Sequence, residues 1–200
     1  QMRVSLLPGL LTALATNGRR QVKDVRLFEA GHIYQKRKKS SEERQRLAGV
    51  LAGSADQHNW GQKMRPVDFF DVKGHVERLL RLARREFDAE FLPIEDEAYQ
   101  AGQSAQIQLK GKEIGRVGRI SPGLLEEAEI VVPVFGFELD WAEIEMTEPP
   151  SFRAISRFPR VIRDISIVLS EKFVAADAVA IIKSAASELL VQFELIDLYT

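Results

Sequence analysis

Apolar positions follow two different periods along the chain, and these periods predict where helices and strands lie. Leucines recur at helical spacing from Leu6 to Leu14, which predicts an amphipathic helix near the start. Ser5 is a candidate N-cap for this helix, and Pro8 falls in the first turn, where proline is tolerated. Asn17-Gly18 then provides a stop signal, so the helix is expected to end there.

A long β-hairpin is predicted next, from two strand-like runs that flank a basic tip. The first run covers residues 25–35, the tip is Lys36–Lys39, and the return run lies around residues 46–53. Gly31 interrupts the first run, which indicates a bulge or a close backbone approach. A charged tip of this kind is typical of a solvated loop, although it could also bind phosphate.

The middle of the chain alternates between a second helix and further strands. Asp68 begins a helical pattern that extends to residue 86, with Val72, Val76, Leu79, Leu80 and Ala83 as its apolar stripe. Residues 104–120 predict two strands that turn at Lys110-Gly111. A short helix or turn at 120–129 and a strand at 131–140 follow. Asp140 and Glu143 have capping-box spacing before a short helix at 141–146.

The composition changes at a proline-rich joint, residues 147–150. Beyond it, apolar alternation through Ile165, Ile167 and Leu169 predicts a strand, 175–190 a helix, and 191–200 another strand. This β-α-β half is too small to bury a core of its own. Both ends of the sequence interrupt a pattern, so we expect a piece of a longer polypeptide. No internal repeat is visible.

Composition limits the function classes without selecting one. Of the 200 residues, 45% are hydrophobic and 28% charged, as is ordinary for a globular protein. The formal net charge of −1 gives no global attraction to nucleic acid, so any such surface must be local. Cysteine is absent, which excludes disulfides and thiolate metal sites. No apolar run approaches the roughly 20 residues of a membrane span, so no membrane partner is expected.

Glu138 and Asp140 are the first candidates for chemistry, because residues two apart on a strand face the same side. A pair of carboxylates could act as general acid and base. The alternative is structural: Asp140 would cap the following helix and Glu138 would face solvent from an ordinary strand. The structural interpretation is preferred.

The other candidates are histidines and arginines. His32, His58 and His75 match no metal-ligand spacing, so metal binding is not expected. Arginines that interleave with Phe152 and Phe158 could bind RNA through phosphates and stacked bases, or could pair with carboxylates while the phenylalanines seal a domain joint. These arginines are Arg153, Arg157, Arg160 and Arg163. Phosphate loops and hydrolase or metalloprotease signatures are absent from the sequence.

Several separated blocks resemble the β subunits of bacterial phenylalanyl-tRNA synthetases. They are MRVSLLPGLLTAL, VRLFEAGHIY, DFFDVKGHVERLL, GRISPGLL, VFGFELDWAEI and RFPRVIRDISIVL, in that order. The resemblance covers essentially the whole chain. One departure is YQAGQSA, residues 99–105, where the family tends to have a His-Pro-Gly pattern. An α+β fold is implied: a class II synthetase-like antiparallel sheet flanked by helices, followed by a partial ferredoxin-like β-α-β unit.

The resemblance also implies that this core is not catalytic. Gln35 falls where an active class II site needs an arginine for the α-phosphate of ATP, and glutamine offers neither charge nor a bidentate fork. Glu138 replaces a glycine of the ATP-binding strand and Trp141 replaces its arginine. A carboxylate there would repel a triphosphate. Hence no catalytic residue is expected in this chain, with Gln35, Glu138 and Trp141 as degenerate positions.

By the same resemblance, residues 1–146 form a non-catalytic core, 147–150 a linker and 151–200 the first half of an anticodon-binding domain. The family implies a cytoplasmic α2β2 enzyme that charges tRNA(Phe), with ATP and Mg²⁺ bound by the α subunit and no cofactor in this piece. Arg157, Arg160 and Arg163 are the candidate tRNA contacts. Two rival hypotheses are a stand-alone RNA-binding or interaction module with a degenerate synthetase fold, and a small-molecule enzyme that uses Glu138 and Asp140.

Overall fold

The computed structural model describes residues 2–37, 40–56, 60–61, 63–85, 88–145, 159, 161–170, 173, 175–186 and 189–197. The chain divides into two compact units, Gln1–Pro150 and Ser151–Thr200. The predicted linker at 147–150 and His58 lie outside the described residues.

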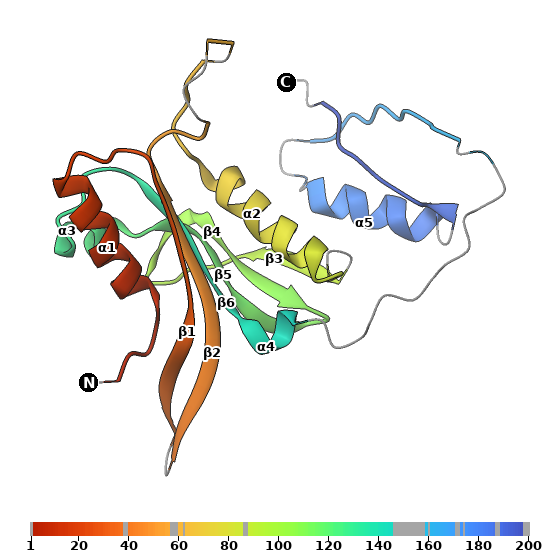
Figure 1. The fold of residues 1–200 in the computed structure, drawn as a ribbon. Helices are drawn as coiled ribbons and strands as arrows, with labels where there is room; N and C mark the ends of the chain where they lie inside the picture. Colours follow the sequence, from red (N-terminus) through yellow and green to blue (C-terminus); the bar gives the residue numbers. More distant parts are fainter. Residues whose placement is uncertain are drawn as a thin grey trace. The chain divides into compact units, whose positions relative to one another are not determined.

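The first unit is built on one six-stranded antiparallel sheet with strand order β1-β2-β6-β5-β4-β3. The strands are β1 Val25–Arg37, β2 Ser40–Ala52, β3 Ala89–Pro93, β4 Tyr99–Leu109, β5 Lys112–Ile120 and β6 Val134–Asp140. The helices of this unit are α1 Leu7–Arg19, α2 Phe69–Leu82, α3 Pro122–Glu127 and α4 Trp141–Ile144. Helices α1 and α3 lie on one side of the sheet and α2 on the other (Figure 1).

Two apolar clusters hold these layers together. One joins α1 and α3 to one face of the sheet, where Val50, Ile120 and Val134 are fully buried. The other joins α2 to the opposite face, through Phe135, Phe137 and Leu139 of β6 among others. Because β6 contributes to both clusters, the predicted division into one apolar and one solvated face of this strand is wrong. When both faces of a sheet are covered, nearly every residue of a central strand is buried.

The long hairpin is confirmed, with a correction at Gly31. Strands β1 and β2 pair without a break from Val25–Ala52 to Arg37–Ser40, so there is no bulge. The close approach is real, because a Cβ at Gly31 would meet the guanidinium of Arg3. Within β2, only Arg46–Ala52 pair with β6. The outer part of the hairpin is therefore a two-stranded ribbon that extends away from the sheet (Figure 1).

Helix boundaries follow the sequence signals in part. Asp68 is the N-cap of α2, as predicted, and forms a capping box with Asp71. For α1, however, the N-cap position belongs to Leu6 and not to Ser5, and the helix continues through Asn17-Gly18 to Arg19. Strand β3 was not predicted, since residues 89–93 are too short and too mixed to show a period of two.

Acid is expected to weaken α2, because Arg65 holds Asp71 in its ionised form. The Arg65 guanidinium donates to both oxygens of Asp71 at 2.7 Å, which lowers the pKa of this carboxyl below its ordinary 3.8. A lowered pKa in the folded state stabilises the fold above pH 3.8, and this contribution is lost as the pH falls through the lowered value. Urea unfolding at pH 7, 4 and 2.5 should therefore show a steeper loss of stability in the wild type than in Asp71→Asn. Equal losses would contradict this origin of acid sensitivity.

The second unit has one described helix, α5 Ala175–Ala186, with no buried residue. The two strands predicted on either side of it are wrong for the residues described, since 161–170 and 190–197 belong to no strand. The physical reason is a missing apolar partner: Ile165, Ile167 and Leu169 are all exposed. A strand needs both a paired backbone and a covered face.

Candidate functional site

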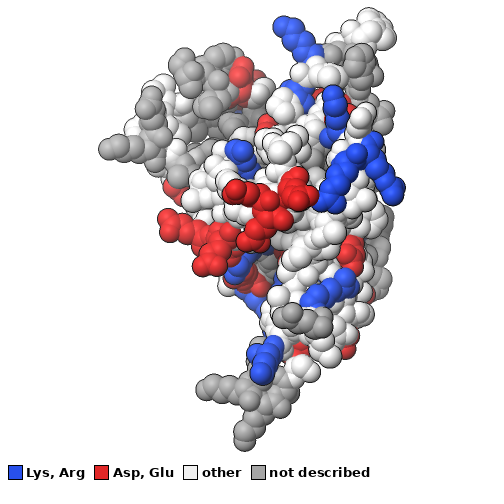
Figure 2. All heavy atoms as spheres, turned by 90° about the vertical axis from the view of Figure 1, so that its left-hand side faces the viewer, with Lys and Arg blue, Asp and Glu red and all other residues white. Residues whose placement is uncertain are grey.

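A cleft of about 280 Å³ opens on the face of the sheet that carries α1. Its walls come from five of the six strands (β1, β2, β4, β5 and β6), from the start of α1 and the segment before it, and from the turn before β4. The lining residues are Val4, Ser5, Leu7, Ile33, Gln35, Arg46, Asp96, Ala98, Tyr99, Glu113, Gly115, Arg116 and Glu138. Two arginines face three carboxylates, so the lining carries a formal charge of −1. Figure 2 shows this side of the molecule, where Asp and Glu side chains gather over part of the surface.

Glu138 is bound to the N-terminus of α1. Ser5 Oγ donates to Oε2 of Glu138 at 2.8 Å, and the Leu6 backbone N–H donates to Oε1 at 2.9 Å. Ser5 Oγ in turn accepts from the Leu7 N–H at 3.1 Å. The leucine at the N-cap cannot cap the helix with its own side chain, so a carboxylate from β6 takes that role.

This arrangement fills the place where the helix would attract an external anion. A helix N-terminus offers unpaired N–H donors and the positive end of the macrodipole. In α1 the Leu6 and Leu7 donors are taken by Glu138 and Ser5, and Pro8 has no N–H to offer. Glu138 is therefore an internal anion at this helix end, and the expectation that it faces solvent is wrong.

Asp140 and Glu138 do not form a catalytic pair, because each carboxylate is bound by other residues. It occupies the N-cap position of α4, but its side chain accepts no capping hydrogen bond, so the predicted capping box with Glu143 is not formed. Its carboxylate lies 3.7 Å from Arg44 Nη1 instead, and Glu143 pairs with Lys112. Each carboxylate is thus held by a different structural partner.

Arg116 lines the cleft directly opposite Glu138 in the β5–β6 ladder. Its guanidinium pairs with Asp96 and, at 2.9 Å, with Glu113. Burial lowers the pKa of Arg116, but the hydrogen bond to Glu113 and the two carboxylate charges outweigh this and raise it. The cation is therefore permanent and already neutralised by its own neighbours, so it is not free to bind phosphate.

Tyr99 lies at the start of β4 and is 5% exposed. Burial raises the pKa of its hydroxyl, and the charges of Glu138 and Asp96 raise it further. The phenol is consequently protonated and neutral at physiological pH. Its oxygen has no hydrogen-bond partner among the described residues, and the same holds for Nε of Arg46.

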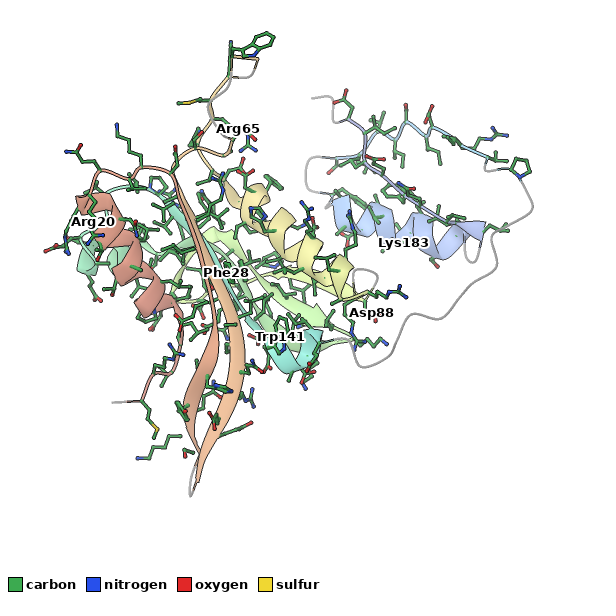
Figure 3. The ribbon with its side chains drawn as sticks, in the orientation of Figure 1. Arg20, Phe28, Arg65, Asp88, Trp141 and Lys183 are labelled. Carbon is green, nitrogen blue, oxygen red and sulfur yellow. The ribbon has the colours of Figure 1, made fainter. Side chains whose placement is uncertain are left out.

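The structure brings together two of the three positions that were predicted to be degenerate. Gln35 and Glu138 both line the cleft. Trp141 does not: it begins α4 and packs against the apolar cluster on the α2 side of the sheet (Figure 3). Its indole is therefore not part of the cleft lining, and its replacement of a nucleotide-binding cation stays a prediction.

Sequence reasoning missed Arg46, Asp96, Tyr99 and Arg116. A period of two shows which residues of one strand share a face, but not which strands are neighbours. Arg116 comes opposite Glu138 only because β5 and β6 pair in this register. A signal existed for Asp96 alone, because a polar turn before a predicted strand is a common place for functional side chains.

The remaining candidates lie apart from the cleft. His32 is an exposed residue of the ribbon, 3.9 Å from Glu43, and His75 belongs to α2. Within the described ranges no three histidines or carboxylates are grouped as metal ligands would be. Lys36 is exposed, and the side chains of residues 37–39 are outside the description, as are Arg157 and Arg160. Arg163 is exposed, and its Nη1 donates to the Ile162 carbonyl at 3.3 Å.

None of the described helices combines the length and the apolar character needed to cross a membrane.

The sheet and its flanking helices have the fold of an aminoacyl-tRNA synthetase. The crystal structure of pyrrolysyl-tRNA synthetase from Desulfitobacterium hafniense superimposes on 71% of this chain and 48% of its own, with a TM-score of 0.51 and 19% sequence identity. Residues 1–141 match the family model described as the phenylalanyl-tRNA synthetase β chain CLM domain. The chain belongs to this family of phenylalanyl-tRNA synthetase β chains. Residues 156–200 match a second model, the ferredoxin-fold anticodon binding domain.

Curated relatives are similar to this chain over nearly its whole length. The phenylalanine–tRNA ligase β subunit of Pseudomonas fluorescens (strain Pf0-1) is 38% identical over 198 residues, 99% of this chain. That of Methylococcus capsulatus is 38% identical over 199 residues, and that of Coxiella burnetii 35% over 198 residues. The chain spans about a quarter of the length of these relatives, 25% in each case.

Proposed function

We propose that this chain is part of the β subunit of a phenylalanine–tRNA ligase, an α2β2 cytoplasmic enzyme that attaches phenylalanine to tRNA(Phe) with ATP and Mg²⁺. Residues 1–146 form a class II-like core that packs against the α subunit without catalysing the reaction. Residues 147–150 connect it to residues 151–200, which belong to the anticodon-binding domain. The names of the relatives and the two family matches support this assignment.

One observation carries the non-catalytic part of the proposal: Glu138 and Arg116, which line the cleft, are already bonded to groups of the protein. Glu138 holds the N-terminus of α1, and Arg116 is paired with Asp96 and Glu113. Gln35 lines the cleft without any charge to offer a phosphate. The residues present therefore do not fit ATP, and no reaction step is assigned to this cleft.

Kinetics of the assembled enzyme test the proposal. The full-length parent should be co-expressed with an α subunit, and aminoacylation of tRNA(Phe) should be measured for the wild type and for Gln35→Ala. A structural cleft predicts kcat within about twofold of the wild type, whereas loss of a group that stabilises the transition state costs about 100-fold or more. A large fall in kcat with a normal elution volume of the tetramer would contradict the proposal. So would a parent that forms no complex with α.

Arg157, Arg160 and Arg163 are proposed to contact tRNA phosphates. Charge reversal to glutamate at each position in the full heterotetramer should weaken tRNA(Phe) binding about 5- to 10-fold and lower the dependence of the affinity on salt. Lys183→Glu on α5 makes the same charge change and is the matched control. Filter binding at several salt concentrations measures both quantities. If charge reversal of an arginine weakens tRNA binding no more than Lys183→Glu does, that arginine is not part of the binding site.

A further inference from the structure

Four arginines gather at the C-terminal end of α2, and none of their side chains has a partner among the described residues. Arg78, Arg81 and Arg84 are exposed and Arg85 is half-buried, and together they form the α2 arginine cluster. Elsewhere in this unit, five arginines pair with carboxylates: Arg3, Arg19, Arg44, Arg65 and Arg116. The cluster therefore presents cations that its described surroundings do not neutralise.

Glu77 is the carboxylate of α2 best placed to pair with the cluster, but it serves another cation. It precedes Arg81 by four residues, the spacing and order at which a glutamate and a cation pair well on a helix. Its Oε1 accepts instead from Lys73 Nζ. Residues 73–85 thus carry five cationic side chains and one carboxylate, although the whole chain has a formal charge of −1. A near-neutral chain needs a local positive surface of this kind in order to bind nucleic acid.

The turn that ends α2 places a cation where the backbone favours glycine. Arg84 has a φ of 58°, in the left-handed region. Its N–H donates to the Arg81 carbonyl at 3.0 Å, and the Arg85 N–H donates to the Leu80 carbonyl at 2.7 Å. These are the bonds of a Schellman motif, whose left-handed residue is usually glycine because a side chain is strained there. A role for the Arg84 side chain outside the fold gives a reason for this strain.

Guanidinium groups in this arrangement suit a chain of phosphates. Arg78 and Arg81 are three residues apart and share one face of α2, and Arg84 and Arg85 follow in the turn that ends the helix. A planar guanidinium binds phosphate oxygens through two parallel hydrogen bonds. Leu82, 71% exposed in the same stretch, offers an apolar surface that a sugar can cover. Contacts of this kind position a nucleic acid without reading its sequence.

We propose that the α2 arginine cluster binds the phosphate backbone of tRNA, in addition to the candidate contacts of residues 151–200. The identity of the RNA rests on the function proposed above. Cations at the C-terminal end of a helix also interact favourably with the helix dipole, so the test needs a control for that effect. Arg20 supplies it, because it is an exposed arginine at the C-terminal end of α1, on the other side of the sheet (Figure 3).

Filter binding of tRNA(Phe) to the full-length parent assembled with an α subunit, at several salt concentrations, tests the proposal. Loss of three phosphate contacts in Arg78→Gln/Arg81→Gln/Arg85→Gln should weaken binding about 30-fold or more and lower the salt slope by about 2 to 3. The corresponding triple lysine variant keeps the charges and should keep the slope. Arg20→Gln should leave both quantities unchanged.

Arg84→Gly separates binding from folding. Glycine relieves the left-handed strain, so the melting temperature should stay the same or rise while tRNA affinity falls about fivefold. A fall in melting temperature with unchanged tRNA affinity would show that Arg84 serves the fold alone, and would remove it from the cluster's binding role.

A triple glutamine variant that binds tRNA with the affinity and salt slope of Arg20→Gln overturns the proposal. So does a triple variant that no longer elutes as the tetramer, because the cluster would then be a contact between subunits. Normal aminoacylation with an unchanged salt slope would contradict the cluster alone. A parent that forms no complex with α, but whose RNA affinity still falls in the triple variant, would contradict the ligase assignment alone.

Discussion

Replacing Glu138 with alanine is expected to lower the free energy of unfolding of the first unit by about 2–3 kcal/mol, since two charge-assisted hydrogen bonds are lost and the end of α1 is left uncapped. The two bonds come from Ser5 Oγ and the Leu6 N–H. Glu138→Gln keeps a carbonyl that can accept from Leu6 but loses the charge, so about half of that loss is expected.

Urea unfolding followed by tryptophan fluorescence measures this effect, because Trp141 immediately follows the strand of Glu138. Glu127→Ala, on an exposed turn of α3, removes the same carboxylate and should change stability by less than about 0.5 kcal/mol. If Glu138→Ala matches that control, the carboxylate does not hold α1, and the internal occupation of the cleft loses its support.

The second large effect is expected on the other face of the sheet, where α2 packs. Leu80 is 0% exposed and lies in the α2-side cluster, whereas Leu82 of the same helix is 71% exposed. Leu80→Ala should cost about 3 kcal/mol through lost burial and the cavity left behind, and Leu82→Ala less than about 0.5 kcal/mol. Both changes are leucine to alanine within one helix, so helix propensity is matched.

Thermal and urea unfolding of the two leucine variants gives the comparison directly. Similar destabilisation by both would mean that α2 is held by its own capping and propensity and not by packing on the sheet. Destabilisation by Leu80→Ala alone supports the layered arrangement in which β6 is covered on both faces.

Local signals predicted much of the first unit. The leucine period gave α1, the Lys110-Gly111 turn gave the β4–β5 hairpin, and Asp68 marked the start of α2. These features depend on residues that are neighbours in sequence, so a single sequence contains the information. In the second unit the helix was predicted but its flanking strands were not realised in the described residues, because a strand depends on partners that local pattern cannot identify.

The site was predictable only in part, for the same reason. Side-by-side placement of Glu138 and Asp140 followed from the period of two, but what covers Glu138 did not. Its partners are 132 and 133 residues away in sequence, at the start of α1. Gln35, which the family resemblance marked as a degenerate position, lines the cleft, whereas Trp141, marked in the same way, does not, since a resemblance gives a position and not the direction of a side chain.

The central claim is that this cleft, lined by carboxylates and by Arg116, which the protein already pairs, does not bind nucleotide. Calorimetric titration of the 200-residue chain with Mg²⁺–ATP tests it most directly, with the proposed α2β2 enzyme, assembled from the full-length parent and an α subunit, as the positive control. The account predicts no saturable heat for the chain up to about 1 mM ATP, a limit that corresponds to a binding free energy weaker than about −4 kcal/mol. A micromolar dissociation constant for the isolated chain would contradict it.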